Sequence, residues 1–376
     1  MPFDAFHRDA LPGRLASPLG RRAARDVAGA PAIAFRLPDG RARRWRHRDG
    51  TIVVESSDVA PVVVELGEDA WDDFVCEHAT VAGLRYAGRL SLAQGTFDQL
   101  ERWEPALRAI FSDRPILDPA ARPDLDLQRR FTLDDPPDVM RRFLDTTGFL
   151  HVRGVFSRNE IADLGTVVER ARTAARPGDG RSWWAKRADG TAVLCRLIYL
   201  GLTFPQIAAL SDDERLRRLA ALGSEPLRPM GDRCDGHSVV IKHPDVVEGL
   251  SDLPWHRDCG LGGHPTTCPK LNLGVQLDAA TAASGRLLFL AGSHRGSCHR
   301  ADLDRPGLPI VAVDTEPGDC TLHIGDVLHA APPPTGIGPG RRALYITWMP
   351  ARAYDVIPAG GSYNDVVRAG IGNPQA

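Results

Sequence analysis

The chain has 376 residues, of which 43% are hydrophobic and 25% charged, and its formal net charge is -2 at pH 7. This length predicts two domains, and the apolar content excludes a disordered or fibrous protein. The near balance of acidic and basic residues excludes a global attraction to nucleic acid or to an anionic membrane. No run of about eighteen apolar residues occurs and residues 1–15 lack a hydrophobic core, so we expect a cytoplasmic protein without membrane insertion.

Seven cysteines are scattered along the chain, and no two of them have Cys-x-x-Cys spacing. An odd number of cysteines in a long chain without a secretion signal predicts reduced thiols. The spacing also gives little support to a structural zinc site.

The first part of the chain predicts an α+β domain. Alternating or β-branched runs indicate strands, and apolar residues at helical spacing indicate helices. We expect strands at 32–35, 51–55, 62–66 and 90–92, and helices at 70–78 and 97–111. The proline-bearing stretch 114–123 predicts a linker, so we divide the chain into domains 1–120 and 121–376.

The order of these elements resembles the sterol carrier protein 2-like fold over about residues 20–112. The matching positions include Trp71-Asp72-Asp73-Phe74 on the predicted helix and Gly88-Arg89-Leu90 at the following strand. The resemblance implies an apolar cavity for a lipid or a sterol-like group. A small domain that only packs against its neighbour is the other interpretation.

One local basic run, residues 41–48, contains five arginines and Trp45. Such a run is found in sites for nucleic acid or for the phosphates of an acyl-CoA. A solvated strand edge that discourages edge pairing is the interpretation that we favour. We therefore expect no nucleic-acid partner.

The second part of the chain predicts a mainly-β domain with flanking helices. A helix from Asp135 leads into a strand at 148–152, and Ser157 begins another helical pattern. After Ser238 short strand-like runs are separated by Gly, Pro and Asp, which is typical of a β-sandwich or a double-stranded β-helix. These runs are residues 239–242, 271–277, 286–290, 320–324, 327–330 and 344–348.

His256 and Asp258 form a His-x-Asp pair, and on a strand this spacing points both side chains to the same face. One metal ion can then bind both. The stretch 318–329 supplies two candidates for a third ligand, His323 and His329. We favour His329, because it precedes the Pro/Gly turn that leads to Arg341, and an antiparallel hairpin brings these two side chains together. His323 stays the alternative ligand, with packing or support of the ligands as its other role.

Two imidazoles and one carboxylate leave three adjacent coordination positions, which suits Fe(II) with a chelating co-substrate and dioxygen. A closed zinc site would need a fourth protein ligand. The planar guanidinium of Arg341 can bind the far carboxylate of 2-oxoglutarate as a bidentate pair. Arg342 points to the opposite face of the expected strand and is the alternative. Lys242 offers a second positive charge for a carboxylate of the co-substrate or substrate, and a solvated lysine is its other interpretation.

These residues resemble the phytanoyl-CoA dioxygenase family of Fe(II)/2-oxoglutarate oxygenases over about residues 135–350. The resemblance implies a double-stranded β-helix (jelly roll), decarboxylation of 2-oxoglutarate to succinate with O2, and hydrogen abstraction from an aliphatic carbon. Five motifs in the family's order carry it: Gly148-Phe149 with Gly154-Val155-Phe156-Ser157, Trp255-His256-Arg257-Asp258, Gly285-Arg286-Leu287 with Gly292-Ser293-His294-Arg295, Gly318-Asp319 with Leu328-His329, and Arg341-Arg342-Ala343-Leu344.

The chain departs from the family where Ala330-Ala331 replace a frequent Gly-Ser, so one contact to the co-substrate is missing or comes from elsewhere. Asp258 leaves no coordination site for chloride, which favours hydroxylation or a related C–H oxidation over halogenation. We therefore expect an Fe(II)- and 2-oxoglutarate-dependent dioxygenase for a small, apolar or lipid-like substrate. The alternatives are a lipid- or sterol-binding protein that keeps the barrel without activity, and an enzyme that uses the triad without 2-oxoglutarate.

Overall fold

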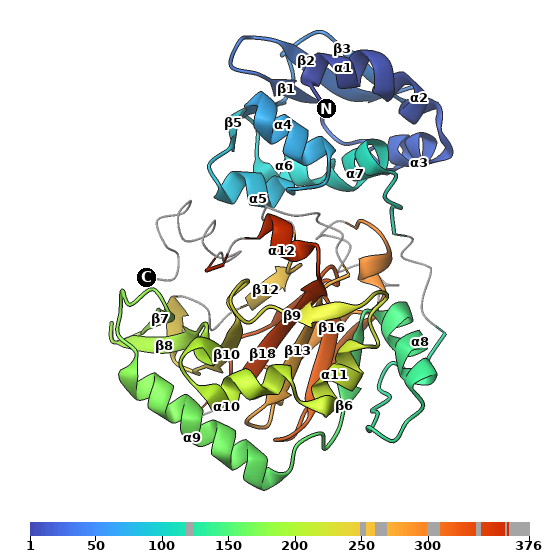
Figure 1. Cartoon of the computed structure of the whole chain (residues 1–376). Coiled ribbons are helices and arrows are strands. Elements are labelled where there is room, and N and C mark those ends of the chain that lie inside the picture. The colour runs from blue at the N-terminus through green and yellow to red at the C-terminus, as the bar shows by residue number, and fades with distance from the viewer. Residues whose placement is uncertain are drawn as a thin grey trace.

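The computed structural model describes residues 1–117, 124–248, 253–259, 269–298, 309–335, 340–357 and 359–360. Two large hydrophobic cores lie in it, one formed by residues 3–111 and one by residues 131–348. We call residues 1–117 the N-terminal domain and the described residues from 124 onward the C-terminal domain (Figure 1). The boundary expected between residues 120 and 121 lies outside the described residues. Within the described ranges, no helix combines the length and the hydrophobicity needed to cross a membrane.

The N-terminal domain contains one five-stranded sheet in the order β3-β2-β1-β4-β5, in which β1 and β4 are parallel and the other neighbours antiparallel. The expected strands at 51–55 and 62–66 have the observed bounds. The strands are β1 (Ile33–Arg36), β2 (Ala42–Arg48), β3 (Thr51–Glu55), β4 (Val62–Leu66) and β5 (Leu90–Gln94). The helices are α1 (Phe3–Ala5), α2 (Leu11–Ala16), α3 (Pro18–Asp26), α4 (Glu68–Val75), α5 (Val81–Tyr86), α6 (Phe97–Glu101) and α7 (Glu104–Ser112).

The single helix that we expected at 97–111 is two helices, α6 and α7. Pro105 lies in the first turn of α7, where a proline is tolerated because the N–H it lacks has no helical acceptor there. In a continuous helix the same proline would remove a hydrogen bond and clash with the preceding turn. The indole of Trp103 fixes the break by donating to the carbonyl of Pro31 at 2.8 Å.

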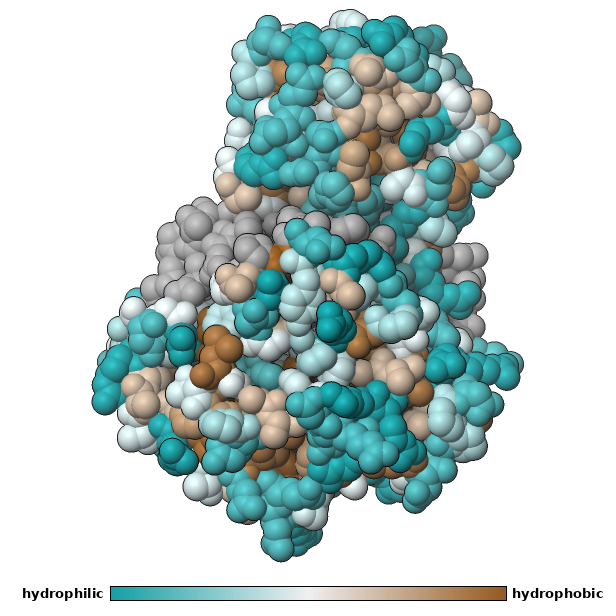
Figure 2. Space-filling view, in the orientation of Figure 1, coloured by the Kyte–Doolittle hydropathy of each residue, from teal (hydrophilic) through white to brown (hydrophobic). Residues whose placement is uncertain are grey.

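Aromatic side chains fill the core of the N-terminal domain. The ring of Trp71 packs at 4.8–5.6 Å, between ring centroids, against Phe3, Phe6, Phe35 and Phe111. The visible face of the domain is mostly hydrophilic, as Figure 2 shows, so the apolar surface has been collected inside. The likeness to the sterol carrier protein 2-like fold stays a prediction.

The basic run 41–48 is not a strand edge, because β2 lies between β1 and β3. That expectation was wrong, since the edge strands of this sheet are β3 and β5. The arginines of the run are paired with acidic side chains rather than left to solvent. Arg41 bonds to Asp4, Asp39 and Glu68, Arg43 bonds to Asp4, and Arg44 and Arg46 both bond to Glu55.

The C-terminal domain has a larger and a smaller sheet, in the jelly-roll-like arrangement that we expected. The larger has the order β11-β7-β8-β10-β18-β13-β16-β6, with β9 beside β18, and the smaller has the order β12-β17-β14-β15. The larger consists of β6 (Phe149–Val152), β7 (Ser182–Arg187), β8 (Ala192–Leu197), β9 (Leu227–Pro229), β10 (His237–Lys242), β11 (Val246–Glu248), β13 (Leu271–Gln276), β16 (Cys320–Ile324) and β18 (Arg341–Pro350), and the smaller of β12 (Leu253–His256), β14 (Leu287–Leu290), β15 (Ile310–Val313) and β17 (His329–Ala331).

Helices cover the outer face of the larger sheet. They are α8 (Pro137–Thr147), α9 (Arg158–Ala174), α10 (Pro205–Ala208) and α11 (Glu214–Ala220), and α12 (Ala353–Val356) follows β18. The helix expected after Ser157 is α9, which begins with a capping box formed by Ser157 and Glu160. Leu164 and Val168 of α9 share one core with Val239 and Ile241 of β10. Because successive residues of a strand alternate in direction, Val240 and Lys242 of β10 point to the interior between the two sheets.

Candidate metal centre

The smaller sheet brings the expected ligands together. Strands β12 and β17 are antiparallel neighbours, and His256 stands directly opposite His329 in their register. Their ring centroids are 4.2 Å apart. Asp258 follows two residues after His256, and its backbone N–H donates to the carbonyl of Gly325 at 2.9 Å, which anchors it beside the end of β16.

The three side chains present their donor atoms to one point. The Oδ1 atom of Asp258 is 3.8 Å from Nε2 of His256 and 3.8 Å from Nε2 of His329. One ligand atom from each residue lies within 4.8 Å of the other two. A single ion can therefore bind all three, and two imidazole nitrogens with one carboxylate form the donor set that suits Fe(II) with open positions.

The second oxygen of Asp258 holds the carboxylate in place. Its Oδ2 accepts hydrogen bonds from the amide of Asn272 and, at 3.0 Å, from Nε2 of His323. Asn272 is fixed in turn, because the hydroxyl of Thr347 donates to its Oδ1 at 2.8 Å. With Oδ2 engaged in this way, Oδ1 is the atom that faces the two histidines.

The backbone carbonyl of Val327, two residues earlier, orients the buried ring of His329. Its Nδ1 lies 3.0 Å from the carbonyl of Val327. Since a carbonyl only accepts, Nδ1 carries the proton and Nε2 offers its lone pair to the metal position. Such a hydrogen bond on the far ring nitrogen is the usual support of a metal-binding histidine.

Burial and neighbouring charges keep Asp258 and His329 in the protonation states that metal binding needs. Burial alone raises the pKa of Asp258, but the positive charge of Lys270 and the neighbouring His329 and His323 outweigh it, and the pKa lies well below its usual value. Burial lowers the pKa of His329 to about 4, against the opposing effect of Asp258. At neutral pH the site therefore offers a carboxylate and a neutral imidazole.

His323, the alternative third ligand, has a different task in this geometry. Its Nε2 donates to Asp258, and its ring centroid is 4.5 Å from that of His329. The residue thus holds the Asp258 carboxylate, and its role as support rather than as a ligand stays a prediction.

Arg341 and Lys242 lie side by side, because they are partners in the register of β10 and β18. Both are almost completely buried, with 2% and 0% of their surface exposed. The Nε of Arg341 donates to the carbonyl of Gly285 at 3.0 Å, and Nζ of Lys242 donates to Pro332 at 2.7 Å and to Ala331. Lys242 is thus not the solvated lysine that was its other interpretation.

Arg342 points away from this interior, as expected from strand alternation. Its guanidinium binds Asp278 and Glu169 of α9 on the outer face. By contrast, no carboxylate among the described residues lies within ion-pair distance of Arg341. A buried guanidinium without an anion is costly, so Arg341 has the character of a site for an anionic ligand.

Asn272, Thr347 and Lys270 are the parts of the centre that the sequence did not reveal. Asn272 and Thr347 are directly paired residues of β13 and β18, so they point to the same side of the larger sheet as His323. The one available signal was a polar residue within an apolar strand, at Asn272 in the run 271–277. It becomes informative only once the strand is placed beside Asp258.

Comparison with known proteins identifies the group to which the chain belongs. The sequence profile of the phytanoyl-CoA dioxygenase (PhyH) family matches residues 144–343, which is more than half of the chain. The chain belongs to the PhyH family. It is accordingly a non-haem iron, 2-oxoglutarate-dependent oxygenase, with Fe(II), 2-oxoglutarate and O2 as cofactor and co-substrates.

Several solved structures are similar to this PhyH chain. AviO1 from Streptomyces viridochromogenes Tue57 is 25% identical, with 60% of this chain and 98% of that chain covered and a TM-score of 0.48. The epimerase SnoN from nogalamycin biosynthesis is 21% identical, with 57% and 81% covered and a TM-score of 0.48. EctD from S. alaskensis, solved with bound Fe, is 20% identical, with 66% and 86% covered and a TM-score of 0.47. No curated protein matches the chain.

Proposed function

We propose that this PhyH oxygenase hydroxylates an aliphatic C–H bond of a small apolar substrate, a lipid-like molecule or a natural product, at an iron held by His256, Asp258 and His329. The observation that carries the proposal is the convergence of these three donor atoms within 4.8 Å. When bound, iron, 2-oxoglutarate and O2 would supply the oxidation: 2-oxoglutarate would lose CO2 and become succinate, and O2 would give one oxygen atom to succinate and the other to the hydroxylated substrate.

The protein's own part is to hold the ligands still and to bind the co-substrate. Asn272 and His323 fix one oxygen of Asp258, so that the other stays directed at the metal position. The carbonyl of Val327 keeps the proton of His329 on Nδ1. Ligands that are fixed before binding lose little conformational entropy when the metal enters.

We assign the far carboxylate of 2-oxoglutarate to Arg341. A buried guanidinium with no carboxylate partner among the described residues supports this role, because a bidentate carboxylate would satisfy it. Lys242 is our second residue for the co-substrate. Its ammonium lies near the same glycine as Arg341, since a Cβ built on Gly285 would be 3.2 Å from the Nζ of Lys242.

The proposal that the substrate is apolar is supported by the apolar surroundings of two histidine rings at the centre. The ring of Phe289 lies 6.0 Å from that of His329 and 5.5 Å from that of His323, between centroids. Phe289 is 1% exposed and stacks on Phe149 at 4.7 Å between centroids, so it excludes water from these histidine rings.

The test compares the wild type with His256→Ala. Anaerobic addition of Fe(II) and 2-oxoglutarate to the wild type should give a weak visible charge-transfer band, and a panel of small apolar compounds in air should yield succinate. His256→Ala should show neither the band nor succinate. The matched control is His78→Ala in the N-terminal domain, an exposed histidine that should leave both readouts at the wild-type level.

Three outcomes decide against the proposal. Iron-dependent succinate formation by His256→Ala would remove the assigned ligands. The absence of any band in the wild type would favour a lipid- or sterol-binding protein without activity. Product formation with iron but without 2-oxoglutarate would indicate a different use of the triad. Hydroxylation itself is checked with ¹⁸O2, because a hydroxylated product carries one labelled oxygen and a desaturated or cyclised product carries none.

A further inference from the structure

A buried charge cluster connects the N-terminal domain with the metal centre. Its central residue is Asp326, which lies in the turn between β16 and β17, three residues before His329. Two guanidiniums bind this carboxylate, those of Arg114 and Arg257. The side chains of all three residues are 5–12% exposed, so the cluster is inside the protein.

Arg257 belongs to the metal centre by its position, because it stands between His256 and Asp258. Its guanidinium lies 3.2 Å from Oδ1 of Asp326, and it donates to the carbonyl of Ser293 at 3.1 Å. It also donates to the backbone carbonyl of Asp326. The segment 256–258, which carries two of the proposed ligands, is thereby tied to the turn that leads into β17, which carries the third.

Arg114 belongs to the segment that leaves the N-terminal domain after α7. Besides its ion pair with Asp326, it donates to the carbonyl of His294 at 3.1 Å. The backbone of the same segment is fixed just after Arg114, because the N–H of Leu117 donates to Ser297 and the N–H of Ser297 donates to Pro115, both at 2.7 Å. The N-terminal domain thus contacts the turn 293–297, on which Arg257 also rests.

The cluster continues into the N-terminal domain. Arg108 of α7 forms a buried ion pair with Glu77, with Nε to Oε1 at 2.8 Å, and its charge interacts with that of Asp326. These two are the buried charged residues of the N-terminal domain. Burying two guanidiniums against one carboxylate costs desolvation free energy. An apolar contact would hold the two domains together without this cost, so the cluster is not explained by domain association alone.

We propose that Asp326 is a positioning residue which, held between Arg114 and Arg257, sets His329 against the His256–Asp258 strand end, so that docking of the N-terminal domain raises the affinity of the centre for its metal. This inference rests on the proposed ligands. It assigns to the N-terminal domain a role in the centre that does not require it to bind a lipid.

The experiment measures the affinity for Co(II), used as a probe for Fe(II), by calorimetric titration of the full chain at 20 °C. Asp326→Asn should raise the Kd for Co(II) about 10–100-fold, the usual effect of losing a residue that supports metal ligands. Arg114→Gln should raise it about tenfold, although this side chain touches none of the ligands. The double variant should bind no more weakly than Asp326→Asn alone, because Arg114 acts through Asp326.

The matched control is Arg215→Gln. Arg215 is also a partly buried arginine with several partners, Val155, Glu160 and Asp213, none of which contacts the three ligands. It should lose stability without a change in the Kd for Co(II). Circular dichroism at 20 °C confirms that each variant is folded, and the visible spectrum of bound Co(II) shows whether the ligand set is kept.

The outcomes separate the two proposals. A wild type that binds no Co(II) overturns the proposed ligands and the inference with them. A wild type that binds Co(II), together with an Arg114→Gln variant that binds it equally tightly, overturns the inference alone. Should Asp326→Asn not fold, Arg114→Gln and its control still decide the question.

Discussion

The two domains treat buried polar groups in opposite ways. Among the described residues, the N-terminal domain buries two polar or charged side chains, Glu77 and Arg108, whereas the C-terminal domain buries nineteen. The N-terminal interior is instead packed with tryptophan and phenylalanine rings. The two exceptions are paired with each other and lie toward the C-terminal domain, in the cluster around Asp326.

This difference indicates that the N-terminal interior serves stability, whereas the C-terminal interior also serves function. A buried polar group costs free energy unless it is paired, so an interior that collects many of them is not built for stability alone. In the C-terminal domain they include Lys242, Arg341 and His329, which are buried in the interior between the two sheets. The N-terminal domain gains its stability from apolar burial and has no comparable cluster among its residues 1–117.

Among single substitutions, we expect Trp71→Ala in the N-terminal core to cause the largest loss of stability. The indole is 0% exposed and touches four phenylalanine rings, so its loss should lower the free energy of unfolding by about 4 kcal/mol. Chemical denaturation measures this change.

Val59→Ala is the control for Trp71→Ala, because Val59 is 73% exposed and should change stability by under about 0.5 kcal/mol. A cost of about 1 kcal/mol or less for Trp71→Ala would contradict a packed core. It would point instead to a cavity beside the ring, as the sterol carrier protein 2-like fold implies.

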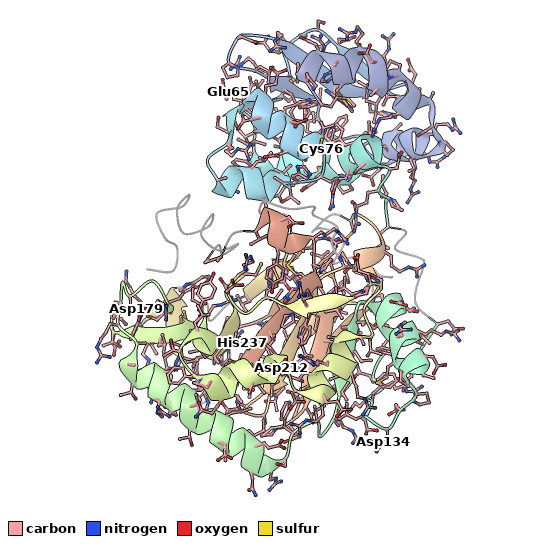
Figure 3. All side chains as sticks on the ribbon, viewed as in Figure 1. Glu65, Cys76, Asp134, Asp179, Asp212 and His237 are labelled. Carbon is pink, nitrogen blue, oxygen red and sulfur yellow. The ribbon has the colours of Figure 1, made fainter. Side chains whose placement is uncertain are left out.

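The next effect concerns a buried polar group of the C-terminal domain that is not in the metal centre. His237 of β10 is labelled in Figure 3, and its Nε2 lies 2.9 Å from the hydroxyl of Ser211. Burial lowers its pKa from 6.5 to about 4. Between these two values the unfolded chain binds the proton and the folded chain does not, so stability falls as the pH drops from 6.5 toward 4.

The share of His237 in this acid destabilisation is about 3 kcal/mol when the pH has reached 4. His237→Gln should remove it, so that the unfolding free energies of variant and wild type, measured by denaturation between pH 7 and 4, converge or cross as the pH falls. The exposed His78→Gln should follow the wild type. Parallel curves for His237→Gln and wild type would show that the ring is accessible to protons in the folded state.

Part of the fold was predictable from the sequence, because some elements are determined by residues that are close together in the chain. The bounds of β4 and β16 follow from short β-branched or alternating runs. The closeness of His256 and Asp258 was expected from their spacing, although β12 ends at His256 and Asp258 is placed by its hydrogen bond to Gly325 rather than by strand alternation. The choice between His323 and His329 as the third ligand depends on more distant contacts, since they lie six residues apart in consecutive strands that belong to different sheets. Only their placement relative to Asp258 gives them different roles.

The remainder depends on contacts between distant segments. Arg114 and Asp326 are 212 residues apart, and neither belongs to a motif that would mark the pair. Asn272 acts on Asp258 through a strand order that no local pattern fixes. The basic run 41–48 was misjudged for the same reason, because its neighbours and the acids that neutralise it come from other parts of the domain.

The smallest of the three effects is a change in the KM for 2-oxoglutarate, and it compares substitutions of Arg341 and Arg342. The comparison distinguishes an arginine that binds the co-substrate from one that forms structural ion pairs. Arg341 is buried beside Lys242 without a carboxylate partner among the described residues, whereas Arg342 forms ion pairs with Asp278 and Glu169. Arg341→Gln should therefore weaken co-substrate binding, and the KM for 2-oxoglutarate should rise about 30-fold, or about 2 kcal/mol, the size of a lost charged hydrogen bond.

The free energy of unfolding, unlike the KM, should hardly distinguish the two variants. Arg341→Gln removes a buried charge that no acid compensates, so its free energy of unfolding should not fall by more than about 1 kcal/mol. Arg342→Gln breaks two partly exposed ion pairs and should cost a similar small amount of stability, while the KM for 2-oxoglutarate stays at the wild-type value. If Arg342→Gln raised the KM and Arg341→Gln did not, the register of β18 would place the wrong arginine in the interior. If neither did, the far carboxylate would be bound elsewhere, with Lys242 as the next residue to replace.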